Sequence, residues 1–465
     1  MSNTLIFGIG NFITKFIYFF LMPIYTLTLT TKEFGLADLL NNSLQLILPI
    51  LTLSITEAVF RFSLDKDIYH EALLANAIRI LMISYVVVFS VIGVIYVYTL
   101  QTYWIYFGIL YATESLKTLL AQFTRGIGKV KAYAINGIIG AICLLIATWI
   151  FLKILAYGIN GYLLSFITAE VASIIFLLWI IKIKNFINLS IFDKPLIKKM
   201  LYYSLPLIPN TLSWWLTNIS SRYVIAGFCG IGIAGLFSAA SKLPALINIF
   251  ASVFQLSWQY SSVQEYQESK ESSFYTTVFQ YYSILVLVAG SIIIWVTPYI
   301  SKLILKGSFY VAWEYTPLLI FAAIIGCYSM FFGTFYSTVK NSKGAMYSTL
   351  YGSLVNLILC FALIPIVGVF GALIANIVSY LVITLIRYRD TIKYISLKVT
   401  YIKLITSFII ILIESVSLTT QKSFPYSLYF IFPIILVALY RNNIISILRY
   451  SRTSIFRRNA DDHNS

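Results

Sequence analysis

Eight charged residues stand inside long hydrophobic stretches of the sequence, where they would lie at membrane depth: Lys15, Glu57, Glu114, Lys117, Glu170, Arg222, Lys242 and Glu414. A charge in the bilayer core costs roughly 2.5 kcal/mol or more, so it normally faces a polar cavity or a partner. Lysine and arginine supply charge and donors to phosphate or carboxylate groups. The chemistry that these residue types favour is therefore the binding of an anion, with proton transfer as a second role for the carboxylates.

The basic residues belong to polar stripes at helical spacing. The stripes combine Lys15 with Asn11, Tyr18 and Tyr25, Arg222 with Thr211, Trp214 and Asn218, and Lys242 with Ser238, Asn248, Ser252, Gln255 and Gln259. A further stripe of Asn42, Gln45, Thr52 and Thr56 is interrupted by Pro49. No acidic neighbour stands at helical spacing from Lys15, Arg222 or Lys242, so each binds an anion or pairs with a distant carboxylate. The plain alternative is that these polar residues join helices by hydrogen bonds or reach the interface.

The acidic residues divide into paired and lone carboxylates. The spacing of Glu57 with Arg61, and of Glu114 with Lys117, predicts local ion pairs on a helix. Glu170 and Glu414 are predicted to be lone carboxylates, either hydrogen-bonded and protonated or coupled to proton movement. We therefore predict substrate-binding cations at Lys15, Arg222 and Lys242, and cavity or coupling roles for Glu57, Arg61, Glu114, Lys117, Glu170 and Asn218.

The composition places these residues in a membrane protein. The chain of 465 residues is 60% hydrophobic and 11% charged, with a mean hydropathy of +0.87. A chain of this composition has too few polar residues to cover the surface of a water-soluble fold of this size. The four cysteines lie in apolar stretches without C-x-x-C spacing, so we predict packing roles and no metal site. The net charge is +16, and the basic residues that cause it lie between hydrophobic runs. This distribution is typical of residues that set membrane topology, and it argues against a nucleic acid partner.

Hydrophobic runs of about twenty residues predict an all-α integral membrane protein with about 14 spans. The predicted spans are 5–29, 36–60, 74–99, 103–124, 132–152, 158–181, 202–228, 233–258, 275–300, 313–338, 346–367, 369–386, 404–420 and 425–440. With a cytoplasmic N-terminus, 24 lysines and arginines fall on the cytoplasmic side and five on the other. This asymmetry predicts that both termini lie in the cytoplasm, as in a protein of the inner membrane.

An internal repeat divides the predicted spans into two six-helix lobes. Basic residues precede a G-x-x-G turn twice, at Gly158–Gly161 and Gly368–Gly371, and Gly35-Leu36 matches Gly235-Leu236 at an offset of 200 residues. Both copies start on the same side, so the repeat is parallel. The predicted organisation is a lobe of residues 1–186, a lobe of 187–390, two additional helices in 391–441, and a basic cytoplasmic tail of 442–465.

Three blocks of this sequence resemble the polysaccharide flippases of the multidrug/oligosaccharidyl-lipid/polysaccharide (MOP) exporter superfamily, including the O-antigen and teichuronic-type exporters. The blocks are NFITKFIYFFLMPIYTLTLTTKEFGLADL, KKMLYYSLPLIPNTLSWWLTNISSRYVIAGFCGIGIAGLFSAASKLPALI and NLILCFALIPIVGVFGALIAN. The family commonly has an acidic residue before the arginine of the seventh helix, where this chain has Ser221 before Arg222. Arg222 is therefore expected to lack a built-in partner and to meet an anion.

The resemblance implies a two-lobed bundle that moves an undecaprenyl-diphosphate-linked oligosaccharide across the cytoplasmic membrane by alternating access, for surface polysaccharide synthesis. It implies no enzymatic activity and no cofactor, with coupling to a proton or sodium gradient as a family-level expectation. The expected partners are the polyprenyl-diphosphate-linked oligosaccharide, membrane lipids, a polysaccharide polymerase and a chain-length regulator. Lys15, Arg222 and Lys242 would neutralise the diphosphate and acidic sugars.

Two alternatives stay open at the level of the sequence. Within the same fold, the chain could flip lipid II or export another substrate, although a pump for cationic drugs would need carboxylates where the first helix has Lys15. A different class is a membrane-embedded polysaccharide polymerase or glycosyltransferase, which would need catalytic residues on a sizeable outer loop. The predicted outer loops are short, and the sequence contains no G-x-x-x-x-G-K-[ST] motif for nucleotide-driven transport.

Overall fold

The computed structural model describes residues 17, 20–65, 67–182, 191–268, 272–339, 341–420, 425–443 and 445. Lys15 and nearly all of the predicted basic tail, residues 444 and 446–465, lie outside the described residues. The described part of the chain is helical, with turns and no strand. The predicted fold class, an all-α membrane protein, is confirmed.

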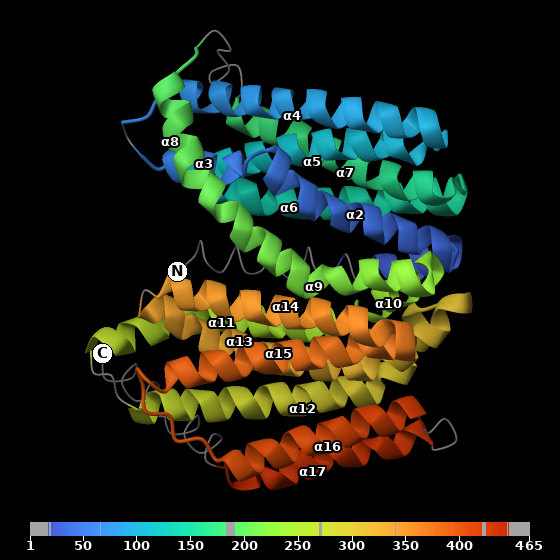
Figure 1. Ribbon diagram of the computed structural model, residues 1–465, viewed down its shortest axis with the longest axis vertical. Helices are drawn as coiled ribbons and strands as arrows, with labels where there is room; N and C mark the ends of the chain where they lie inside the picture. The colour runs from blue at the N-terminus through green and yellow to red at the C-terminus, as the bar shows by residue number, and fades with distance from the viewer. Residues whose placement is uncertain are drawn as a thin grey trace, which may run out of the picture. The chain divides into compact units, whose positions relative to one another are not determined.

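Nine helices are described in the first half of the chain, and Figure 1 shows them in blue to green. They are α2 (Thr31–Leu51), α3 (Ile55–Phe62), α4 (His70–Thr99), α5 (Tyr103–Gly126), α6 (Val130–Thr148), which a π-helical turn (Trp149–Ile154) extends, α7 (Gly158–Ile181), α8 (Lys194–Ser204), α9 (Ile208–Cys229) and α10 (Ile231–Ala240). A 3-10 turn at Leu205–Leu207 joins α8 to α9.

The described residues of the second half form seven helices and two 3-10 segments. These are α11 (Pro244–Glu268), α12 (Ser272–Ile304), a 3-10 segment (Gly307–Tyr315), α13 (Thr316–Thr338), α14 (Ser342–Val367), α15 (Val369–Thr391), α16 (Tyr401–Thr420), a 3-10 segment (Tyr426–Phe430) and α17 (Ile431–Leu439). Among the described residues, nine helical stretches are long and apolar enough to cross a membrane. The number of 14 spans stays a prediction.

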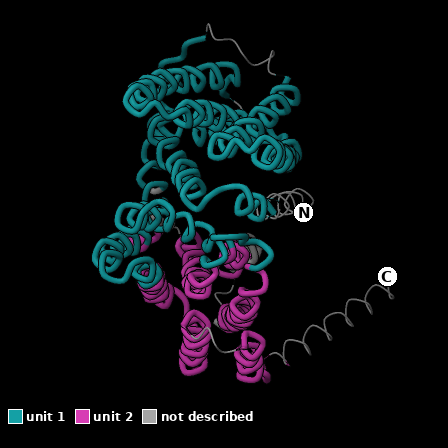
Figure 2. The backbone as a smooth tube through the Cα atoms, turned by 90° about the vertical axis from the view of Figure 1, so that its right-hand side faces the viewer, with its two compact units in different colours: residues 1–242, 302–312, 349–375 teal, residues 243–301, 313–348, 376–465 magenta. Residues whose placement is uncertain are grey.

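The chain divides into two compact units, which Figure 2 shows in two colours. Unit 1 comprises residues 1–242, 302–312 and 349–375, and unit 2 comprises 243–301, 313–348 and 376–465. The predicted division into two six-helix lobes, two additional helices and a tail, with boundaries after residues 186, 390 and 441, stays a prediction.

Each unit has its own core. In unit 1, helices α3, α4, α5, α7 and α8 meet around fully buried side chains that include Leu74, Phe123 and Met200. In unit 2, α13 is the central helix, because it is buried along most of its length. Its Phe331 stacks on Trp258 of α11, with ring centroids 4.7 Å apart. Inside a membrane the hydrophobic effect does not drive helices together, because the lipid is as apolar as the side chains. Direct contacts between aromatic rings therefore contribute to the association of these helices.

Three predicted spans are broken by proline. The span 36–60 ends as α2 at Leu51 and resumes as α3 at Ile55, because Pro49 disturbs the helical hydrogen bonds and Leu53 and Ser54 take left-handed backbone angles. The span 233–258 breaks between α10 and α11, where Pro244 lacks the N–H group that would continue the helix. The span 202–228 is interrupted near its start by the 3-10 turn Leu205–Leu207, which contains Pro206 and separates α8 from α9.

The glycines of the predicted repeat occupy matching structural positions. Gly158 and Gly368 both take positive φ angles, of 55° and 61°; Gly158 is the first residue of α7, and Gly368 directly precedes α15. Gly161 and Gly371 both leave no room for a side chain, since a Cβ atom would lie 2.9 Å from the carbonyl oxygen of Phe151 or 2.6 Å from the carbonyl carbon of Leu363. The first glycine of each G-x-x-G turn thus takes a positive φ angle, and the last glycine of each has no room for a side chain.

Helices α2 and α10 cross at Gly35 and Gly235, the pair that the sequence aligned at an offset of 200. A Cβ atom on Gly35 would lie 2.2 Å from the carbonyl oxygen of Ile231, and one on Gly235 would lie 2.1 Å from that of Thr31. The backbones can approach this closely only because both residues are glycine. The close approach at these glycines also brings the residues that follow Gly35 on α2 opposite the residues that follow Gly235 on α10.

Candidate functional site

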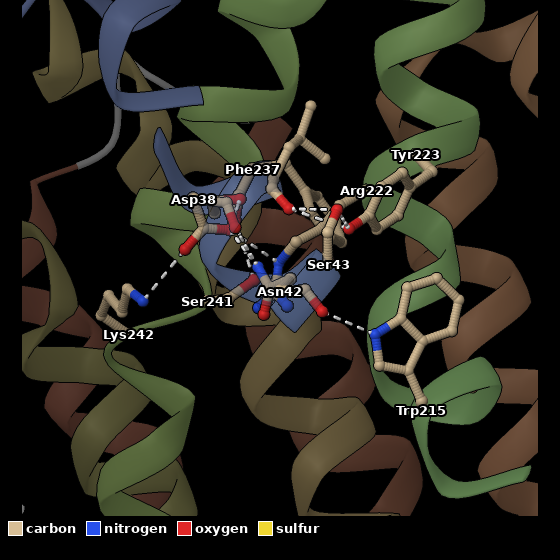
Figure 3. Close-up of polar contacts among 11 residues, drawn as sticks. Asp38, Asn42, Ser43, Trp215, Arg222, Tyr223, Phe237, Ser241 and Lys242 are labelled. Atoms are coloured by element: carbon tan, nitrogen blue, oxygen red, sulfur yellow. Dashed lines mark hydrogen bonds and ion pairs between the residues drawn. The ribbon is translucent and has the colours of Figure 1, made fainter. Parts of the chain in front are cut away.

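Asp38 lies on α2 one turn beyond this crossing, and it is buried among polar partners (Figure 3). Its Oδ2 atom accepts hydrogen bonds of 2.7 Å from Asn42 Nδ2 and from Ser238 Oγ. Its carboxylate also pairs with two cations, Arg222 at 3.5 Å and Lys242 at 3.4 Å. We call Asp38, Arg222 and Lys242 the cation cluster.

The geometry of the cation cluster follows from the α2–α10 crossing. Asp38 and Ser238 are separated by 200 residues, as are Asn42 and Lys242, so these pairs stand at matching positions beyond Gly35 and Gly235. Helix α9 is joined to the same face of α2 by Trp215 Nε1, which donates to the carbonyl oxygen of Asn42 at 2.9 Å (Figure 3). Three helices of unit 1 thereby place their polar side chains at one point.

The charges of the cation cluster do not balance. Two cations share one carboxylate, which leaves one positive charge in excess. The side chain of Arg222 is 15% exposed and that of Asp38 is 5% exposed, whereas that of Lys242 is 40% exposed. The excess charge is therefore accessible at the Lys242 ammonium, and an anion could bind there.

The structure decides between the two alternatives that the sequence left open for Arg222, an anion or a distant carboxylate. No acidic residue precedes Arg222 on its own helix, and Asp38 of another helix supplies the carboxylate. The structure brings together Arg222 and Lys242, two of the three predicted substrate-binding cations, at the carboxylate of Asp38. Lys15 lies outside the described residues, and Asn218 lies on α9 without a described side chain.

A second charged cluster joins α5 to α7. Lys117 Nζ lies 2.9 Å from Glu114 Oε2, as the spacing predicts, and also 2.9 Å from Glu170 Oε2. Thr118 Oγ1 donates to Glu114 at 3.3 Å. The prediction that Glu170 is a lone carboxylate is therefore wrong. This carboxylate cluster, Glu114, Lys117 and Glu170, contains one carboxylate more than ammonium groups.

The predicted pair of Glu57 with Arg61 is also wrong. Arg61 Nη1 pairs with Asp65 Oδ1 at 2.6 Å, because Asp65 stands one turn in the opposite direction, just beyond the end of α3. Glu57 instead accepts a hydrogen bond from Gln122 Nε2 at 3.5 Å.

Glu57 lines a cavity of about 140 Å³ in unit 1, at the break between α2 and α3. The cavity is lined by Leu48, Pro49, Thr52, Ser54, Thr56, Glu57, Ser115, Thr118 and Thr211. Thr118 connects its wall to the carboxylate cluster. A carboxylate and several hydroxyl groups around one space can bind hydroxyl-rich or cationic groups.

Glu414 lies apart from these groups, in unit 2. It is fully buried on α16, and Ser291 Oγ of α12 donates to its Oε2 atom at 2.6 Å. Within the described residues, no group of three or more His, Cys, Asp or Glu side chains is placed to hold a metal ion. Cys327 and Cys360 are buried in helix contacts and free of disulfides, which fits packing.

The fold is similar to that of solved membrane transporters of the MOP superfamily. The structure matches an inward-facing multidrug resistance MATE family transporter of this superfamily with a TM-score of 0.66 and 13% identity, over 82% of this chain and 95% of that one. It matches the lipid II flippase MurJ in an inward closed conformation with a TM-score of 0.64 and 15% identity, over 95% and 100% of the chains. A MOP transporter from Pyrococcus furiosus matches with a TM-score of 0.56 and 14% identity, over 84% and 94%.

The sequence comparison then defines the family. The model of the polysaccharide biosynthesis protein family matches residues 1–259, which is more than half of the sequence, so this chain belongs to that family. The matched region includes the whole cation cluster. No curated protein matches the sequence. The predicted resemblance to polysaccharide flippases of the MOP superfamily is confirmed, and the chain is a multi-pass membrane protein.

Proposed function

We propose that this protein is a flippase that moves a polyprenyl-diphosphate-linked oligosaccharide across the cytoplasmic membrane by alternating access, for surface polysaccharide synthesis. The observation that carries the proposal is the cation cluster, in which two cations face one carboxylate inside a membrane unit. In this proposal Asp38 holds Arg222 in place, while the more exposed Lys242 meets the diphosphate. Both termini lie in the cytoplasm, and a proton or sodium gradient drives the cycle.

The family supports a role in polysaccharide synthesis, and the fold supports transport. One solved protein of this fold is described as a lipid II flippase, so a lipid-linked sugar substrate is consistent with the architecture. The cavity beside Glu57 offers hydroxyl groups for the sugar part of such a substrate. A polymerase and a chain-length regulator would then act on the units delivered to the outer leaflet.

Replacing Lys242 with glutamine is expected to lower surface glycan about tenfold, because a charged hydrogen bond to phosphate contributes roughly 1.5–3 kcal/mol. The variant is tested in a strain that lacks the gene, with surface glycan and the leaflet of the lipid-linked units measured together. Lys242→Arg should retain export. Lys153→Gln, which removes an exposed lysine of the π-helical turn, is the matched control and should leave export unchanged.

The leaflet separates the candidate functions. A flippase whose Lys242→Gln variant is impaired leaves completed units in the inner leaflet. Full export by Lys242→Gln at normal protein levels would exclude the cation cluster from the transport path. Units that reach the outer leaflet but stay unpolymerised after gene deletion would contradict the flippase and favour a polymerase.

A further inference from the structure

A small pocket lies in unit 2, where the ends of α12, α16 and α17 meet. It is lined by Phe279, Gln280, Ser283, Val399, Thr400, Lys403, Leu404, Tyr440 and Asn443. Its volume is about 50 Å³, and since one water needs roughly 10–15 Å³ measured in this way, the pocket has room for a group of several heavy atoms. It belongs neither to the cation cluster nor to the cavity beside Glu57.

Among the described residues that line this pocket, Lys403 is the one that carries a charge. Its Nζ atom lies 3.5 Å from Asn443 Oδ1 and 6.0 Å from the centre of the Tyr440 ring. In the described part of the chain, Lys403 forms no ion pair with a carboxylate. The ammonium is therefore held in position by neutral groups, which leaves its charge available to an anion.

Neutral polar groups complete the surroundings of Lys403. Asn443 Nδ2 donates to Gln280 Oε1 at 3.4 Å, which connects the end of the chain's described part to α12. Ser407 Oγ donates to the hydroxyl group of Tyr440 at 3.2 Å. These contacts hold three elements around the pocket, and they place amide and hydroxyl groups that can supplement a lysine in binding oxygen atoms.

Two more cations flank the pocket. Lys398 precedes the lining residue Val399, and Arg441 follows the lining residue Tyr440, and both side chains are exposed. The pocket also adjoins the first turn of α16, a 20-residue helix whose N-terminal end carries partial positive charge. The field at this point is therefore positive, and a phosphate group has the charge and oxygen atoms to match it.

The position along α16 indicates the source of the phosphate. Tyr401–Thr420 is long and apolar enough to span a membrane, and Lys403 is its third residue. The side chains of Tyr394 and Tyr401 are exposed at the same end, and tyrosines favour the level of the lipid headgroups. The charge distribution of the sequence predicts that this end is cytoplasmic, where anionic lipids face basic protein pockets.

We propose that the pocket around Lys403 binds the phosphate of an anionic membrane lipid headgroup. Lys403 contacts the phosphate directly, Asn443 and Gln280 bind its remaining oxygen atoms, and Lys398 with Arg441 attract the headgroup to the pocket. The bound lipid joins the two C-terminal helices to α12. The site is independent of the transported substrate.

The test uses the full chain in nanodiscs of phosphatidylcholine that contain phosphatidylglycerol, with native mass spectrometry to count retained lipid. Lys403→Gln is expected to lower retention of phosphatidylglycerol about tenfold, because it removes one charged hydrogen bond. Lys403→Arg should retain the lipid. Lys393→Gln is the matched control, because Lys393 lies in the same segment, pairs with Asp390 at 2.8 Å and does not line the pocket.

Two further measurements keep the result decisive. Asn443→Leu changes a lining residue and leaves the charge of the pocket unchanged, and it should lower lipid retention by a smaller factor than Lys403→Gln does. This variant tests the pocket even if Lys403→Gln fails to fold. An excess of inorganic phosphate should not displace the lipid. If inorganic phosphate does displace the lipid, the pocket is a site for free phosphate, and the lipid assignment is overturned. Equal retention by Lys403→Gln, Asn443→Leu and Lys393→Gln would overturn the pocket itself.

Discussion

Replacing Asp38 with alanine is expected to lower the free energy of unfolding by about 3–5 kcal/mol, because it leaves Arg222 and Lys242 together without their carboxylate. Asp38 is 5% exposed, and it also accepts hydrogen bonds from Asn42 and Ser238, so four partners lose their acceptor at once. The expected result is a large fall in the melting temperature of the detergent-solubilised protein. The matched control is Asp65→Ala, which removes the carboxylate of an exposed pair and should cost at most about 1 kcal/mol.

A second substitution separates charge from packing at this position. Asp38→Asn retains the shape of the side chain, and combining it with Arg222→Gln removes one charge of each sign. The double variant should therefore be more stable than the sum of the two single losses predicts, since Asp38→Asn alone leaves Arg222 and Lys242 together without their carboxylate, and removing Arg222 relieves that repulsion. Additive losses would show that Asp38 and Arg222 do not interact across α2 and α9, against the structure.

Replacing Lys117 with methionine is expected to destabilise the protein by about 3–5 kcal/mol, because Glu114 and Glu170 then face each other without a cation. The side chain of Glu170 is 9% exposed, so water screens little of the repulsion. The measurement is the melting temperature in detergent. Lys393→Met is the control, because it breaks an ion pair at the same spacing whose lysine is 59% exposed, and the loss there should be within about 1 kcal/mol.

The carboxylate cluster can also be tested by rescue. Adding Glu170→Gln to Lys117→Met removes the second negative charge and should restore most of the lost stability. A stable Lys117→Met single variant would mean that Glu114 and Glu170 do not share this lysine. A double variant as unstable as the single one would show that the loss comes from packing on α5.

The sequence predicts the features of this protein that depend on local spacing. The hydrophobic runs predict the class of fold, and the spacing of Glu114 and Lys117 predicts their ion pair. Local spacing fails where two local partners compete. Arg61 has a carboxylate four residues away on either side, at Glu57 and Asp65, and only the end of α3 at Phe62 and the position of Gln122 decide between them.

Contacts between distant segments cannot be predicted in this way. Asp38 and Arg222 are separated by 184 residues, and Glu170 and Lys117 by 53, so no periodicity connects them. One signal for Asp38 was nevertheless present in the sequence. Asp38 precedes Asn42 by one helical turn, and it stands three residues after Gly35, the glycine that matches Gly235 in the repeat. Aligning that pair places Asp38 opposite Ser238, four residues before Lys242.

The most direct test of the proposed flippase is reconstitution of the purified protein in liposomes that contain the lipid-linked repeat unit of its host. The fraction of units that an added glycosidase can cleave from outside is measured over time. The proposal predicts that wild-type protein exposes nearly all units, whereas Lys242→Gln exposes them about tenfold more slowly. If the units in wild-type liposomes stay as protected as in protein-free liposomes, with and without a proton or sodium gradient, the protein does not flip this substrate.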